Sequence, residues 1–162
     1  MEYDVVLYPI ALLRPSEEVN MAHVEALTKE IVRCQRWTTP IPIEKETGII
    51  MDGNHRYQVA HHLALTYIPC VLLDYTDTRI TVYDWQNGRA FSPLRIREQI
   101  LKQGNIFPYK TTRHLFSPSL PAVNFPLEQL VEKIASNHLN VFKLGVGRWP
   151  LTAGKLNSLV FI

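Results

Sequence analysis

The sequence lacks the features of several large protein classes. It has only two cysteines, Cys34 and Cys70, which are too few for a disulfide framework and do not have the spacing of a metal site. The first residues, MEYDVVLYPI, contain neither a basic region nor a long apolar stretch, so no secretory signal is predicted. Apolar runs are short, as in VLL at 71–73, and none could span a membrane. We therefore expect a cytoplasmic protein without a membrane partner.

A large excess of positive charge is also missing. The 162 residues include 17 basic and 15 acidic side chains, which leaves a net charge of +2. A protein that binds nucleic acid through its phosphates needs more basic charge than this, so nucleic acid is not the expected partner. Hydrophobic residues make up 46% of the chain and charged residues 20%, which is typical of a packed globular core. The length favours a single domain, and the sequence does not indicate an oligomeric state.

Short strands and helices alternate along the chain. Runs of β-branched and aromatic residues predict strands at 4–13, 41–44, 49–51, 70–75 and 80–85. Apolar spacing, capping residues and prolines predict helices at 21–34, 54–65, 93–103 and 127–137. Residues 105–125 are rich in proline and predict a long irregular loop, which in a compact domain is more often functional than idle. The pattern indicates a compact mixed α/β (α+β) domain, a small mixed sheet flanked by helices, over 1–140, with a C-terminal extension of unassigned role at 141–162.

The segment MDGNHR at 51–56 is the first that could carry chemistry, because a strand there turns through glycine into a helix. A helix N-terminus presents free N–H groups and a partial positive charge, which attract phosphate. Gly53 lets an anion approach the backbone, and the guanidinium of Arg56 can pair with phosphate oxygens. Asp52 could hold a Mg²⁺ ion that bridges those phosphates. An ordinary tight turn before a solvated helix start explains the same residues equally well.

Two further segments add charge. KTTRH at 110–114 places three basic side chains and two hydroxyls together, a set that binds phosphate or carboxylate unless it is simply a solvated loop. RPSEEV at 14–19 contains two acidic residues before a predicted helix. One of them could act as a general base, although acidic residues also stabilise the first turn of a helix. Spacing alone does not choose between Glu17 and Glu18.

These segments, taken in order, resemble the free L-serine kinases of the ParB/sulfiredoxin-like superfamily. The matching motifs are RPSEEV (14–19), MDGNHR (51–56), VYDW (82–85), YKTTRH (109–114) and VNFPLEQL (123–130). The strongest are DGNHR, which is close to the family's DGHHR, and KTTRH. The resemblance implies that the protein transfers the terminal phosphoryl group of ADP or ATP to the hydroxyl of L-serine, with Mg²⁺ as cofactor, and produces O-phospho-L-serine.

The resemblance also implies a role for each matched residue. The catalytic residues would be Glu17 as base, Asp52 and His55, and Asp52 would also be the metal ligand. The nucleotide phosphates would contact Gly53, Asn54, His55, Arg56, Lys110, Thr111, Thr112 and Arg113. The serine substrate would contact Val19, Trp85, Thr112, Arg113 and His114.

The sequence departs from the family at several places, and two other functions compete. Asn54 replaces the first histidine of DGHHR, a long insertion before KTTRH is missing, and the chain after Asn140 matches nothing in the family. Sulfiredoxin-like repair would need a cysteine in the phosphate-binding turn, where Asn54 stands. The alternative function is that of a ParB-like nucleotide-binding regulatory or DNA-associated module without kinase activity. The near-neutral charge argues against its association with DNA.

Overall fold

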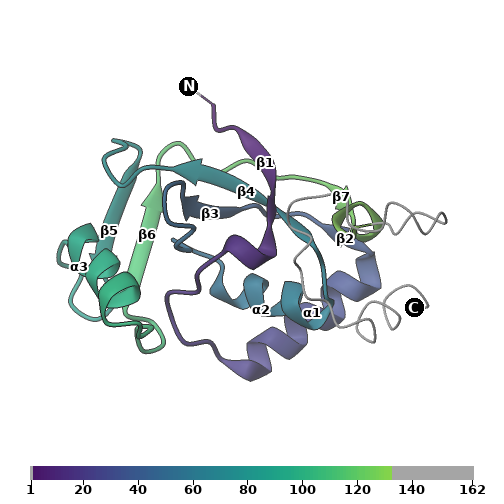
Figure 1. The fold of residues 1–162 in the computed structure, drawn as a ribbon, viewed down its shortest axis with the longest axis horizontal. Helices are drawn as coiled ribbons and strands as arrows, with labels where there is room; N and C mark the ends of the chain where they lie inside the picture. The colour runs from purple at the N-terminus through teal and green to yellow at the C-terminus, as the bar shows by residue number, and fades with distance from the viewer. Residues whose placement is uncertain (1, 133–162) are drawn as a thin grey trace.

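The computed structural model describes residues 2–132, and its centre is a three-stranded sheet (Figure 1). Its strands are β1 (Val5–Pro9), β3 (Ile41–Glu44) and β4 (Tyr67–Leu73), in the order β1-β4-β3. β4 runs antiparallel to β1 and parallel to β3. A parallel pair needs a crossover connection, and the segment between β3 and β4 contains a helix, as in a βαβ unit.

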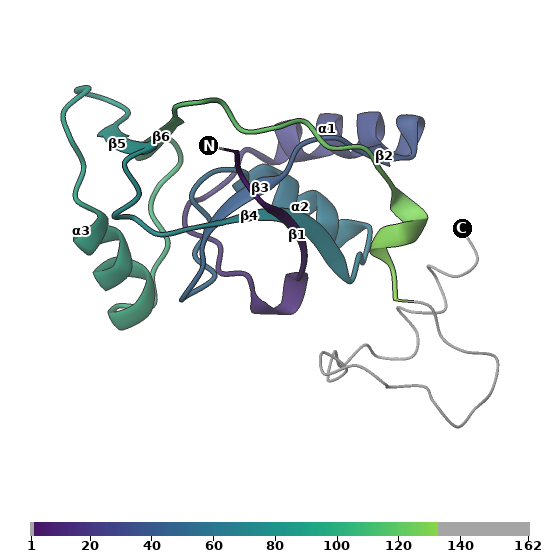
Figure 2. The same ribbon diagram turned by 90° about the horizontal axis from the view of Figure 1, so that it is seen from above.

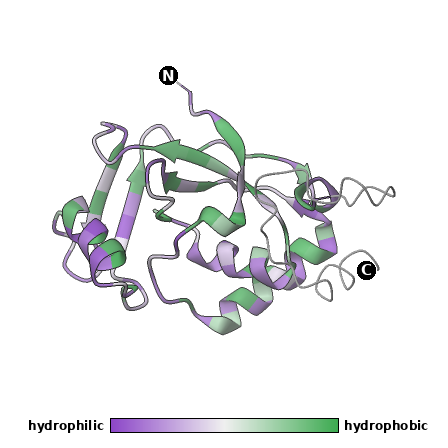
Figure 3. Cartoon of the chain, viewed as in Figure 1, coloured by the Kyte–Doolittle hydropathy of each residue, from purple (hydrophilic) through white to green (hydrophobic). Residues whose placement is uncertain are grey.

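Two helices, α1 (Met21–Cys34) and α2 (Asn54–His62), pack on one another on one side of this sheet (Figure 1). The side chain of Asn20 caps α1, because it accepts hydrogen bonds from the N–H groups of Ala22 and His23. Figure 3 shows mostly hydrophobic residues in the strands of the sheet and alternating hydrophobic and hydrophilic residues along α1, as expected of a helix with one buried face. The main core lies between the helices and the sheet and includes Val24, Ile43, Val59 and Ile68 among its fully buried members.

A second part of the fold lies to one side of the central sheet, at the left of Figure 2. It consists of the antiparallel strands β5 (Ile80–Asp84) and β6 (Thr112–Phe116), the helix α3 (Pro93–Arg97) and a π-helical segment, η2 (Glu98–Lys102). Its own small core contains Ile49, Val82, Phe91, Ile96, Ile100 and Phe107. The remaining elements are the 3₁₀ helices η1 (Ile10–Leu12) and η3 (Leu127–Leu130) and the two-residue strands β2 (Arg36–Trp37) and β7 (Phe125–Pro126).

The mixed α/β fold predicted from the sequence is confirmed, and several boundaries differ. The expected strand at 49–51 forms only isolated bridges, in which Ile49 meets Arg14 and Ile50 meets Ile43. The loop expected over 105–125 contains strand β6, whose pairing with β5 spans too much sequence for a local pattern to reveal. The helix expected at 54–65 ends at His62.

The ends of three other elements also differ from the prediction. The first strand ends at Pro9, where η1 begins, and β4 starts before Pro69 rather than after it. The helix expected at 127–137 is the short η3, which ends at Leu130. Residues beyond 132, and with them the domain boundary expected at 140, lie outside the described part of the chain. Among the described helices, none combines the length and the apolar character that a membrane crossing requires.

Candidate active site

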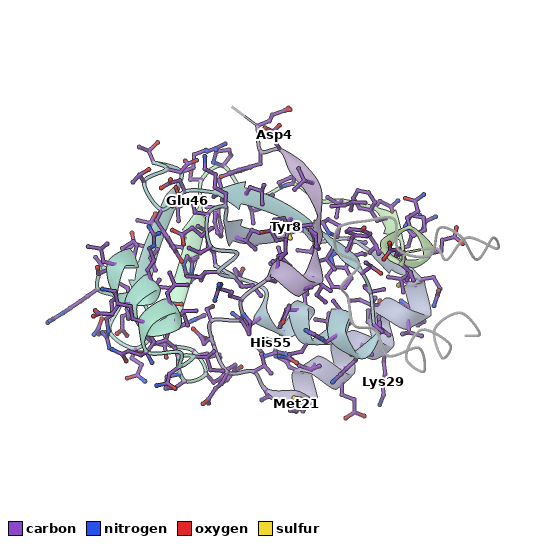
Figure 4. All side chains as sticks on the ribbon, viewed as in Figure 1. Asp4, Tyr8, Met21, Lys29, Glu46 and His55 are labelled. Carbon is purple, nitrogen blue, oxygen red and sulfur yellow. The ribbon has the colours of Figure 1, made fainter. Side chains whose placement is uncertain are left out.

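Residues of three segments, RPSEEV (14–19), MDGNHR (51–56) and KTTRH (110–114), meet at one cavity of about 240 Å³. It lies where the loop before α1, the start of α2 and the loop before β6 come together. Figure 4 labels His55 near the start of α2 and Met21 at the start of α1, and the two helix starts lie close together in this view. The lining residues are Glu17, Glu18, His23, Met51, Asp52, Gly53, Asn54, His55, Arg56, Trp85, Tyr109, Lys110 and Thr112.

The start of α2 forms the floor of this cavity. Gly53, the N-cap residue, has a φ of +103°, a left-handed conformation that glycine adopts without strain. A Cβ at this position would also lie 3.1 Å from Cγ1 of Ile41. Gly53 has no side chain to cap the helix, so the first N–H groups of α2 are available to an anion in the cavity.

His55 stands on the first turn of α2 and is held from the start of α1. The backbone N–H of Asn20 donates a hydrogen bond to its Nε2 at 3.1 Å, which leaves the proton of the neutral ring on Nδ1. Its ring makes edge contacts with the rings of His23 and Tyr109. Burial, and then the neighbouring His23, lower the pKa of His55 below its ordinary value of 6.5. At neutral pH His55 therefore offers an N–H donor rather than a positive charge.

Arg56 lies between the site cavity and a second cavity of about 220 Å³. The second cavity lies beside the C-terminal half of α1 and is lined by Leu27, Glu30, Ile31, Cys34, Arg36, Trp37, Thr38, Thr39 and Arg56. Burial lowers the pKa of Arg56 from 12.5, and Asp52 partly opposes this change, so the guanidinium remains charged at neutral pH. None of the ion pairs within residues 2–132 involves Arg56. A half-buried cation of this kind is suited to an anionic ligand.

The carboxylate of Glu17 holds the loop before β6. Its Oε1 accepts a hydrogen bond from the N–H of Lys110 at 2.7 Å. Its Oε2 accepts from the N–H of Thr112 at 3.0 Å and from the hydroxyl of the same residue at 3.2 Å. Burial raises the pKa of Glu17 above 4.5, although these hydrogen bonds lower it. Glu18 is exposed, so the structure distinguishes two neighbours that sequence spacing could not separate.

Trp85 forms a wall of the cavity beside two cations. Its side chain is 42% exposed, and the Nζ of Lys110 lies 5.4 Å from its ring centroid. The guanidinium carbon of Arg113 lies 5.0 Å from the same ring. Arg113 does not line the site cavity, but it lines an adjoining one of about 260 Å³ that also includes Trp85. This corner combines an aromatic surface with positive charge.

Besides Arg113, three predicted site residues do not line the cavity. Val19 packs against the main core, and the hydroxyl of Thr111 donates to the carbonyl oxygen of Pro108 at 2.7 Å. His114 is buried, with its Nε2 3.0 Å from the hydroxyl of Tyr75. Burial lowers the pKa of His114 to about 3, so this ring is neutral at physiological pH. Val19 is partly buried and His114 is buried, so neither side chain lines the cavity, and their substrate contacts stay predictions.

Two residues of the cavity were missed by sequence reasoning. Tyr109 directly precedes the KTTRH segment, and its ring contacts His55. His23 lies in the first turn of α1, three residues after the capping residue Asn20. Their positions beside a basic motif and a helix cap were the available signals. An isolated histidine or tyrosine gives no periodic pattern that would separate it from an ordinary surface residue.

The sequence is similar to those of a ParB-like protein and of two L-serine kinases. No family model matches the sequence. The chain is 36% identical over 81 residues to a ParB-like protein from Sulfolobus acidocaldarius. It is 29% identical over 105 residues to an ATP-dependent L-serine kinase from Staphylothermus marinus and 25% identical over 105 residues to the ADP-dependent L-serine kinase SerK from Thermococcus kodakarensis. These matches cover 50%, 61% and 62% of this chain and 39%, 41% and 43% of the respective relatives. The chain thus spans about two fifths of the length of these relatives.

Solved structures show the same architecture. A free serine kinase with a glutamate-to-alanine substitution, in complex with AMP, superposes with a TM-score of 0.71 at 15% identity, over 80% of this chain and 95% of the other. A C-terminally truncated SbnI from Staphylococcus aureus gives a TM-score of 0.64 at 15% identity, over 78% of this chain and 88% of the other. The predicted resemblance is therefore confirmed: the chain has the fold of the free serine kinases and is similar in sequence to L-serine kinases.

Proposed function

We propose that the protein is a free L-serine kinase, which transfers the terminal phosphoryl group of ATP or ADP to the hydroxyl of L-serine. The observation that carries this proposal is the meeting of three unlike groups at one cavity. These are a half-buried carboxylate, an uncapped helix N-terminus with an arginine, and a lysine beside an exposed tryptophan. Phosphoryl transfer needs little more than positioning and charge stabilisation, and these groups supply both.

The start of α2 binds the nucleotide phosphates in this proposal. The free N–H groups of its first turn and the guanidinium of Arg56 provide the donors, and neutral His55 adds another. Because Arg56 also lines the second cavity, a nucleotide whose phosphates lie on α2 can extend its nucleoside into that cavity. This arrangement leaves the space near Trp85 for the amino acid.

Magnesium fits the site as part of a metal–nucleotide complex. Among the described residues, no group of three or more histidines, cysteines, aspartates or glutamates could hold a metal alone. Mg²⁺ is commonly held by one or two carboxylates together with substrate phosphates, and Asp52 offers one exposed carboxylate beside the start of α2. Asp52 is therefore the residue that would hold Mg²⁺, which would neutralise phosphate charge when bound.

Glu17 acts as the general base in the proposed reaction. Its carboxylate takes the proton from the serine hydroxyl while that oxygen forms a bond to the terminal phosphorus. The bond from phosphorus to the bridging oxygen breaks, and ADP or AMP leaves with that oxygen. Lys110 and Arg113 stabilise the charge on the transferring group, and Trp85 bounds the serine site.

Phosphorus NMR tests the proposal directly. The full chain is incubated with Mg²⁺ and L-serine, and ATP and ADP are supplied in separate samples. A phosphoserine resonance that requires serine establishes the kinase, and the productive sample identifies the donor. The Glu17→Gln variant should give little product while it still binds nucleotide. Tight nucleotide binding with no phosphoserine from either donor would overturn the proposal and favour a ParB-like nucleotide-binding module.

A further inference from the structure

The side chain of Asn54, the first residue of α2, is bonded to the loop that carries Glu17. Its Oδ1 accepts hydrogen bonds from the N–H of Ser16 at 2.8 Å and from the N–H of Glu17 at 3.3 Å. Its Nδ2 donates to the hydroxyl oxygen of Ser16 at 3.1 Å. That hydroxyl in turn donates to the carbonyl oxygen of Ile50 at 2.6 Å. Asn54 thus joins the start of α2 to the loop before α1.

This geometry differs from the phosphate contact that the sequence predicted for Asn54. Its amide oxygen already has two N–H donors and is an acceptor, so it offers nothing to an anion. Its amide nitrogen directs one N–H to Ser16. The second N–H of that nitrogen and the backbone N–H of Asn54, at the helix start, are the donors left for a phosphate. Three side-chain hydrogen bonds of Asn54 go instead to the loop before α1.

Asn54 and the loop before β6 fix Glu17 from two directions. Asn54 holds the backbone of Glu17, while Lys110 and Thr112 hold its carboxylate. Ser16 is only 5% exposed, so the backbone on this side of Glu17 is anchored in the interior. A base whose backbone and carboxylate are both fixed keeps one orientation toward the cavity, as catalysis by positioning requires.

We propose that Asn54 is a positioning residue for Glu17 rather than a phosphate ligand. The kinetic part of this inference rests on the proposed kinase function. In the Asn54→Ala variant the backbone of Glu17 loses its acceptor, and kcat should fall by about tenfold to a hundredfold, since a displacement of 1 Å can have an effect of this size. The dissociation constant of the nucleotide should remain within about threefold of the wild-type value, because the phosphate donors on α2 are retained.

Asn54→Asp is the matched variant. Aspartate keeps an oxygen that accepts from Ser16 and Glu17, but it loses the donor to the hydroxyl of Ser16. Its kcat should therefore lie between those of the wild type and Asn54→Ala. The new negative charge of Asn54→Asp at the start of α2 should weaken nucleotide binding whichever role Asn54 has, so nucleotide affinity is compared between the wild type and Asn54→Ala only.

Amide hydrogen exchange, followed by NMR on the full chain without substrate, provides a readout that does not depend on activity. Asn54→Ala should exchange faster than the wild type at Ser16 and Glu17, and Asn54→Asp should retain most of the protection. Protection unchanged in Asn54→Ala would overturn the proposal, as would tenfold weaker nucleotide binding with an unchanged kcat. If the wild type made no phosphoserine, the proposed function would fail, and the exchange rates would still decide whether Asn54 holds Glu17. If Asn54→Ala did not fold, Asn54→Asp and Asn54→Ser would be compared in its place.

Discussion

Glu17 and Thr112 lie 95 positions apart and share two hydrogen bonds to one carboxylate oxygen, one from the backbone N–H and one from the hydroxyl of Thr112. The other oxygen accepts from the N–H of Lys110. These contacts join the loop before α1 to the loop that leads into β6. The proposed base therefore determines where the loop with Lys110 lies, and substrate binding and proton transfer depend on the same carboxylate.

The pH dependence of turnover should identify Glu17 as the base. Burial raises its pKa above 4.5, so kcat/KM should decline on the acid side with an apparent pKa above that value, as the carboxylate becomes protonated. Glu17→Gln should lower kcat/KM by about 10²–10⁴-fold and remove this acid limb. Initial rates of phosphoserine formation between pH 4.5 and 8 provide the measurement.

Glu18→Gln is the control for that experiment. Glu18 is exposed, and its backbone N–H donates to the carbonyl oxygen of Phe107, so the substitution leaves the loop in place. It should retain both the activity and the acid limb. Loss of the acid limb in Glu18→Gln, with near-normal turnover in Glu17→Gln, would show that Glu18 is the base and Glu17 is not.

Much of the fold and site could be predicted because the decisive signals are local. The helix at 21–34 was predicted correctly from its asparagine cap and apolar spacing. The turn at Gly53 was recognised because a strand, a glycine and a helix follow one another in the sequence. Family motifs then brought Glu17, Trp85 and Lys110 into one hypothesis, and the structure places all three around one cavity.

What could not be predicted depends on contacts between distant segments. From its sequence, KTTRH is expected to form a basic loop. In the structure its last residues pair with β5 and belong to strand β6, in which side chains alternate between two faces. Arg113 therefore lies outward beside Trp85, and His114 lies in the interior against Tyr75. Similarly, the local sequence around Asn54 gives no sign that its amide binds a loop almost 40 positions earlier.

Arg56 should determine nucleotide affinity. A charged hydrogen bond contributes about 1.5–3 kcal/mol, so Arg56→Gln should weaken binding of ADP by roughly ten- to a hundredfold. Arg56→Lys should recover part of this loss, because it keeps the charge but not the planar fork. Isothermal titration with ADP measures both effects, and Arg95→Gln on α3, which removes a charge that does not line the cavity, is the control. Equal affinities in Arg56→Gln and Arg95→Gln would contradict the phosphate site.

The rate at which the Cys34 thiol is labelled can show whether the second cavity is occupied. This thiol is exposed and lines that cavity, while Cys70 is fully buried, so a maleimide should label Cys34 alone. A hydrogen bond with Glu30 raises the pKa of Cys34, and labelling is therefore best followed at mildly alkaline pH. If the nucleoside lies in this cavity, ADP at about ten times its dissociation constant should slow labelling by about tenfold.

Inorganic phosphate is the matched ligand for the labelling experiment. It can occupy the start of α2 but cannot extend past Arg56 into the second cavity, so it should leave the labelling rate unchanged. Cys34→Ser should take up no label, which verifies that the signal comes from this thiol. An unchanged labelling rate with saturating ADP would place the nucleoside elsewhere.

His114 should make the folded protein less stable in acid. Its pKa is about 3 in the folded protein and near 6.5 in an unfolded chain. Between these values the unfolded chain binds a proton that the folded protein does not, so the free energy of unfolding decreases as the pH falls from 6.5 toward 3. The slope due to this group is at most ~1.4 kcal/mol per pH unit. Urea unfolding between pH 4.5 and 7.5 measures it.

His114→Gln should flatten this dependence, because glutamine does not titrate and its amide can still bond to the hydroxyl of Tyr75. Some slope should remain, since the pKa of His55 is also lowered. His62→Gln replaces an exposed histidine and should leave the slope unchanged. A role of His114 in substrate binding predicts a different result for the folded His114→Gln variant, namely loss of phosphoserine formation. Because the ring is buried and neutral, we expect turnover to persist wherever the variant is folded.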